Sequence, residues 1–160
     1  MIDRVRRRVR GRCEVVRGMR ADLLFVALAA VLVAGSNPGA QAQEPKAEDA
    51  AEVSATTWLA MVDSGHYGES WREAAVLFKG ATTQDEWERR VAGVRAPLGK
   101  VVSRKVRSRQ YAEKLPGAPD GRYVIIEYGT SFENKREAIE TVTPMLETGR
   151  GWRVSGYYIR

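Results

Sequence analysis

The chain is poor in the residues that cross-link proteins or bind metals. Its 160 residues contain one cysteine, Cys13, and one histidine, His66. A single cysteine excludes an internal disulfide, and these two residues cannot supply the four nitrogen and sulfur ligands of a structural zinc site. No ordered Ser–His–acid or Cys–His motif for nucleophilic catalysis is present. We therefore expect no metal site and no cofactor.

The chain also lacks a hydrophobic run long enough to span a bilayer. The apolar run Leu23–Ala34 has twelve residues, whereas a membrane-spanning helix needs roughly 20. Arginines precede this run, and the small-x-small sequence Ala40-Gln41-Ala42 follows it. These three parts predict a secretory signal in residues 1–42, with cleavage between Ala42 and Gln43. Cys13 lies before the apolar run, which excludes a lipid-modified cysteine at the cut.

The positive charge is concentrated in this expected signal. The chain carries a formal net charge of +6, but residues 1–22 hold eight arginines and three acids, which leaves +1 for the rest. Starting at Met19 would give a compact signal of ordinary length, so Met19 is a possible true start. We expect an exported protein, periplasmic or secreted, that meets the membrane only through its signal before cleavage. A nearly neutral mature domain gives no reason to expect nucleic acid as a partner.

The apolar periodicity after residue 42 predicts a single α+β domain over residues 50–160, preceded by a short linker at residues 43–49. Apolar residues recur at three- and four-residue steps over residues 47–63 and 67–78, and again after Thr83, which predicts three helices. Thr83 and Glu86 have the spacing of a capping box at the start of the third helix.

The second half of the chain predicts four strands, at residues 100–112, 122–132, 136–147 and 151–160. Their connections are short, so neighbouring strands must be antiparallel and form a meander. The strand at 122–132 is the most apolar and should be central, whereas the strand at 100–112 should lie near an edge. We expect the three helices to pack on one face of this curved, cone-like sheet.

Several motifs resemble known families. Trp58–Tyr67 followed by Ser70-Trp71 is similar to the opening helical hairpin of the nuclear-transport-factor-2-like (SnoaL-like) superfamily. Five further motifs lie at Arg95–Gly99, Pro116–Gly121, Thr130–Phe132, Glu140–Thr143 and Gly151–Arg160. With these motifs, the chain over about residues 50–160 more closely resembles DUF4019, a bacterial family of unknown function. The resemblance implies a fold but no activity, because the family has no established catalytic residues.

Two titratable residues are candidates for proton transfer. His66 lies between two predicted helices and would need a cleft and an orienting partner to act as a base; the simpler interpretation is an exposed residue near a helix end. Glu127 lies in the most apolar strand. If buried, its pKa would rise and it could carry a proton, but strand alternation favours an outward, solvated position. An isomerase- or cyclase-like enzyme using Glu127 or His66 is the alternative function.

Two further sets of residues are candidates for binding. Tyr128, Tyr158 and Trp152 could line a concavity of the sheet and hold an apolar small molecule or an envelope protein. Lys105, Arg107 and Arg109 should share one face of their strand. They form either an anion-binding surface or a solvated edge that deters strand pairing. We predict a non-enzymatic ligand-binding or interaction module of the cell envelope, whose partner the sequence does not identify.

Overall fold

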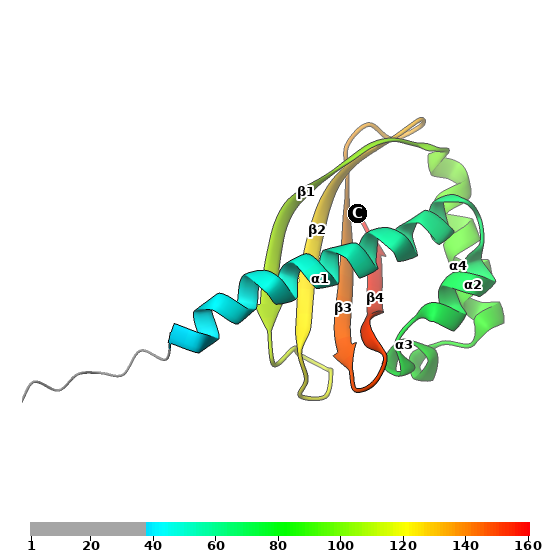
Figure 1. The fold of residues 1–160 in the computed structure, drawn as a ribbon. Coiled ribbons are helices and arrows are strands. Elements are labelled where there is room, and N and C mark those ends of the chain that lie inside the picture. The colour runs from blue at the N-terminus through cyan, green and yellow to red at the C-terminus, as the bar shows by residue number, and fades with distance from the viewer. Residues whose placement is uncertain (1–37) are drawn as a thin grey trace, which may run out of the picture. The chain divides into compact units, whose positions relative to one another are not determined.

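The computed structural model describes residues 38–160. The expected apolar signal run and the alternative start at Met19 lie outside the described residues. Within the described range, none of the helices has both the length and the apolar character needed to cross a bilayer. The elements, in chain order, are α1 (Pro38–Asp63), α2 (Tyr67–Glu73), α3 (Val76–Ala81), α4 (Gln84–Arg95), the 3-10 helix η1 (Ala96–Leu98), β1 (Val101–Ala112), β2 (Tyr123–Phe132), β3 (Ala138–Glu147) and β4 (Gly151–Ile159) (Figure 1).

Helix α1 is longer than the sequence predicted. It begins at Pro38 rather than near Ala47, so residues 43–49, expected to form a linker, are helical. The expected cleavage site between Ala42 and Gln43 therefore falls within α1. The helix ends at Asp63, and Gly65 follows with a φ of 76°. That left-handed conformation is the one that glycine adopts at low cost after a helix.

The single helix expected over residues 67–78 is wrong, because the structure has two short helices there. The chain is extended between α2 and α3, with ψ angles of 165° at Ala74 and 156° at Ala75. The Ala75 N–H donates a hydrogen bond of 2.8 Å to the carbonyl of Val154 in β4. Because this bond joins the segment to the sheet edge, it replaces a helical bond and breaks the helix.

Helix α4 confirms the predicted capping box. The Thr83 side chain accepts a hydrogen bond from the Glu86 N–H, and the Glu86 carboxylate accepts one from the Thr83 N–H. The hydrogen bond from the Thr83 N–H lowers the pKa of Glu86, as expected where backbone N–H groups stabilise a carboxylate. At its other end, α4 continues directly into η1, which contains Pro97.

The four strands form the predicted antiparallel meander in the order β1-β2-β3-β4, with β1 at an edge and β2 in the interior. Alternate residues of β2 and β3 are buried, so one face of the sheet packs against helices and the other does not. Figure 1 shows α1 crossing the strands, with α2, α3 and α4 grouped near β4. We call the buried face, which carries Val124, Ile126 and Tyr128, the inner face, and the face of Ile125, Glu127 and Gly129 the outer face.

An aromatic cluster fills the core between the helices and the inner face. Its ring centroids lie 5.0 to 6.3 Å apart, and the predicted core residues Trp58 and Trp87 are buried. Both indole N–H groups are satisfied, because each donates to Ser70. Side chains therefore occupy the concavity that was expected to hold a ligand. The cluster consists of Trp58, Phe78, Trp87 and Tyr157.

Candidate functional site

The largest concentration of charge in the core is a set of six polar side chains, here called the buried charge cluster. Its central residue is Glu140 on the inner face of β3, which is fully buried. The basic residue Arg95, at the end of α4, is only 5 % exposed. The cluster draws on two helices and all four strands. Its members are Asp63, Arg95, Arg104, Thr130, Glu140 and Tyr157.

Four donors surround the Glu140 carboxylate. Its Oε1 accepts hydrogen bonds from Tyr157 Oη at 2.6 Å and from Arg95 Nη1 at 3.2 Å. Its Oε2 accepts from Thr130 Oγ1 at 2.5 Å and from Arg104 Nε at 2.6 Å. A buried carboxylate is tolerated only when it is paired and hydrogen-bonded in this way. Both oxygens of Glu140 are therefore fully used.

Asp63, at the end of α1, balances the second positive charge. It accepts from Arg95 Nη2 at 2.7 Å and from both terminal nitrogens of Arg104, at 2.6 and 3.0 Å. Burial lowers the pKa of Arg104, but the hydrogen bonds and charges of Asp63 and Glu140 outweigh it and raise that pKa above its usual value. Burial, followed by the charge of Glu140, also raises the pKa of the Tyr157 hydroxyl.

The cluster therefore links α1 and α4 to the four strands of the sheet. Two guanidinium groups and two carboxylates neutralise one another, and the Arg95 guanidinium lies 4.7 Å from the centroid of the Phe132 ring. Each Glu140 oxygen accepts two hydrogen bonds, whereas Asp63 Oδ2 accepts one, from Arg104. Sequence reasoning missed this arrangement. The one available signal was Glu140 itself, an acid on the same side of its strand as the apolar Ala138 and Val142.

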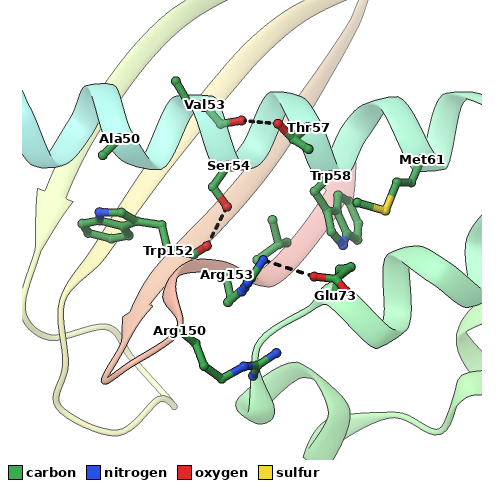
Figure 2. Close-up of a pocket in the computed structure, with 11 residues that line it drawn as sticks. Ala50, Val53, Ser54, Thr57, Trp58, Met61, Glu73, Arg150, Trp152 and Arg153 are labelled. Atoms are coloured by element: carbon green, nitrogen blue, oxygen red, sulfur yellow. Dashed lines mark hydrogen bonds and ion pairs between the residues drawn. The ribbon is translucent and has the colours of Figure 1, made fainter.

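A pocket of about 260 Å³ opens between α1 and β4, and we call it the α1–β4 pocket (Figure 2). The Ser54 hydroxyl donates to the Trp152 carbonyl at 2.8 Å, which fixes α1 against the start of β4. One side of the pocket is apolar, and Val53 there is 69 % exposed. The other side carries Arg153, which pairs with Glu73 at 3.2 Å. The lining residues are Ala50, Val53, Ser54, Thr57, Trp58, Met61, Glu73, Arg150, Trp152, Arg153 and Val154.

The three predicted ligand-contacting aromatic residues do not meet in one site. Tyr128 is buried on the inner face, whereas Tyr158 is 62 % exposed and pairs in register with the outer-face position Thr141. Only Trp152 lines a described pocket. Burial raises the pKa of the Tyr128 hydroxyl, which has no hydrogen-bond partner among the described residues.

The prediction that Lys105, Arg107 and Arg109 share a face is wrong. The β1–β2 register shifts between Val106 and Ser108, and such a bulge moves the following residues to the opposite face. Arg109 consequently points to the inner side, where it pairs with two acids of α1, Asp49 and Glu52.

Lys105 and Arg107 lie on the outer face instead. Lys105 is opposite Gly129 in the register of β1 and β2, and the side chain of Arg107 passes over the same glycine. Arg107 lines a second pocket, of about 520 Å³, which we call the outer-face hollow. Two of the three predicted anion-binding residues therefore remain neighbours, and the third belongs to the packing of α1.

The two candidate proton carriers lie outside both pockets. His66 precedes α2 and is 66 % exposed, with Nδ1 3.8 Å from a Glu69 oxygen. Glu127 faces outward, as strand alternation favoured, and pairs with Arg160 at 3.0 Å. Within residues 38–160, no group of three or more His, Cys, Asp or Glu side chains is arranged to hold a metal ion.

Comparison with known proteins identifies a family but no characterised relative. A family model described as a protein of unknown function, DUF4019, matches residues 54–157. No curated protein and no solved structure matches the chain. The matched region spans the C-terminal part of α1 from residue 54, the other helices and nearly the whole sheet. The chain therefore belongs to the DUF4019 family.

Proposed function

We propose that the protein is an exported, non-enzymatic interaction module of the cell envelope, and that its α1–β4 pocket receives an apolar side chain of a partner polypeptide. The observation that carries this proposal is the pocket itself. It combines an exposed apolar helix residue, Val53, with the half-buried Trp152, and it lies beside paired charges. In the buried charge cluster, by contrast, the central Glu140 carboxylate is fully buried and each of its oxygens already accepts two hydrogen bonds.

The size of the pocket favours a side chain over a metabolite. Small-molecule sites usually enclose roughly 300–1,000 Å³, and this pocket measures about 260 Å³. A residue of the size of leucine or phenylalanine can fill it against Val53 and Trp152. Burying such a side chain contributes about 1.5–3 kcal/mol to the binding free energy, so the partner must also make further contacts around the pocket.

The charges at the pocket favour an acid beside that apolar residue. Arg150 pairs with Glu147, and Arg153 pairs with Glu73. The Nε of Arg153 is buried and makes no hydrogen bond within the described residues. The Arg150 side chain is 37 % exposed, so an aspartate or glutamate of the partner could accept from its guanidinium. The proposed ligand is therefore a peptide segment with a large apolar residue and a neighbouring carboxylate.

Two further parts of the proposal concern export and fold. The arginine-rich start, the apolar run and the small residues before Gln43 support export. Cleavage after Ala42 would leave residues 43–63 of α1, which include its contacts with the sheet. The passage of α1 across one face of a four-stranded meander supports a cone of the nuclear-transport-factor-2-like kind. Mass spectrometry of the periplasmic protein tests export: an N-terminus at Gln43 is expected, and an unprocessed chain would contradict it.

The pocket is tested by selecting peptides from a phage-displayed random library on the purified protein. Val53→Arg blocks the pocket, and because Val53 is an exposed helix position the change should leave the fold intact. Val94→Arg is the matched control, since Val94 is a 50 % exposed valine on α4. We expect selected peptides to carry a large apolar residue near an acid. They should bind the control variant normally and bind Val53→Arg at least ~10-fold more weakly. Equal binding to both variants, or no enrichment, would refute the proposal.

A further inference from the structure

We infer that the outer-face hollow binds a carboxylated sugar, such as a uronic acid unit of an acidic glycan. The hollow lies on the side of the sheet away from α1, so this site is independent of the α1–β4 pocket. Its basic residues come from three separate segments: Arg107 of β1, Arg136 of the β2–β3 connection and Arg160 after β4.

Gly129 forms the floor of the hollow. A side chain at this position would meet the Cδ of Arg107 at 3.2 Å and its Cγ at 3.4 Å, so the aliphatic part of Arg107 lies over the glycine. Together with the half-buried Ile139, this gives an apolar surface on which a sugar ring can rest. The volume of about 520 Å³ falls in the range of small-molecule sites, which is large for a single inorganic ion.

The arginines of the hollow are available to an anion. Arg107 and Arg136 are exposed and form no ion pair with any described residue, whereas Arg160 pairs with Glu127. Lys105 adds a further exposed positive charge opposite Gly129. Arginine binds a carboxylate through two parallel hydrogen bonds, which adds geometric specificity to the attraction.

The remaining polar groups favour a carboxylated sugar over a phosphate. Glu137 lines the hollow; its negative charge repels a doubly charged phosphate more than a singly charged carboxylate, and its oxygens can accept hydrogen bonds from sugar hydroxyls. Ser103 and Ser131 face each other in the register of β1 and β2 and supply two hydroxyls to the same ligand. One carboxylate, several hydroxyls and an apolar ring face together describe a uronic acid.

Calorimetric titration of the purified protein with trigalacturonate tests this inference, with neutral maltotriose and inorganic phosphate as comparison ligands. The double variant Arg107→Gln/Arg136→Gln removes the unpaired arginines. Arg90→Gln, at an exposed arginine of α4, is the control for the loss of positive charge. We expect trigalacturonate to bind, the double variant to weaken it by about tenfold or more, and the control to change it less than ~2-fold.

A third variant separates the shape of the hollow from its charge. Gly129→Val fills the floor at a strand position where valine is favoured, and the flexible Arg107 side chain can move aside. It should weaken trigalacturonate binding while leaving the urea-unfolding midpoint at or above that of the wild type. Absence of binding, equal binding by the double variant, or binding of maltotriose or phosphate as tight as that of trigalacturonate would each overturn the inference.

Discussion

Replacing Glu140 by glutamine should destabilise the domain by about 3–5 kcal/mol, the usual loss when one partner of a buried ion pair is removed. The wild-type carboxylate accepts from four donors, two on each oxygen. Glutamine keeps one acceptor oxygen and turns an amide NH₂ toward the remaining donors. Arg95, which is 5 % exposed, would then retain only Asp63 as a balancing charge.

Glu127→Gln is a closely matched control. Glu127 is also a strand glutamate paired with an arginine, but its side chain is 32 % exposed on the outer face. An ion pair of this kind contributes about 1 kcal/mol or less. Urea unfolding followed by tryptophan fluorescence measures both variants, and unchanged m-values would show that the same transition is compared. A loss of unfolding free energy below about 1 kcal/mol for Glu140→Gln, or equal losses for both variants, would refute the stabilising role of the buried charge cluster.

Three further predictions concern stability and are measured by the same unfolding assay. Thr83→Ala should cost about 1 kcal/mol because it removes the cap of α4, and Thr83→Ser should restore most of it; an unchanged midpoint for the alanine variant would contradict the capping role. Trp87→Ala should cost about 3–5 kcal/mol because it opens the aromatic cluster. Trp152→Ala should cost less, because Trp152 is only half-buried; a larger loss for Trp152→Ala than for Trp87→Ala would contradict the assigned core. Because burial raises the pKa of Tyr157, the unfolded chain should release this proton first, and stability should fall as pH rises above about 10. Tyr157→Phe should flatten that fall, and an unaltered slope would contradict it.

The features that the sequence predicted correctly depend on neighbouring residues. The alternation of apolar and polar residues and the short turns are local signals, so the four-stranded meander and its central strand could be predicted from the sequence. The capping box needs only Thr83 and Glu86, three residues apart. Gly65 after α1 is another local signal, because its positive φ is required where the helix ends.

The features that the sequence did not reveal depend on contacts between distant segments. Ala74 and Ala75 favour helix by themselves, and the helix breaks there because Ala75 bonds to Val154 in β4. The bulge in β1 has no glycine to indicate it, yet it moves Arg109 to the inner face.

The buried charge cluster was hidden for the same reason. Its charged residues are spread from Asp63 to Glu140 along the chain, and only the fold brings them within hydrogen-bond distance. The chain has more arginines than the core can hold, so the pattern of charges alone does not show that Arg95 and Arg104 are the ones that form ion pairs in the core.

The proposal that the α1–β4 pocket receives a partner's side chain is tested most directly by the tryptophan indole N–H signals in a ¹H–¹⁵N spectrum. The indoles of Trp71 and Trp87 donate to Thr82 and Ser70 and are not part of the pocket lining, whereas Trp152 lines the pocket. Titration with a selected peptide should shift the Trp152 signal saturably and leave those of Trp71 and Trp87 in place. A stationary Trp152 signal under saturating peptide would contradict the account.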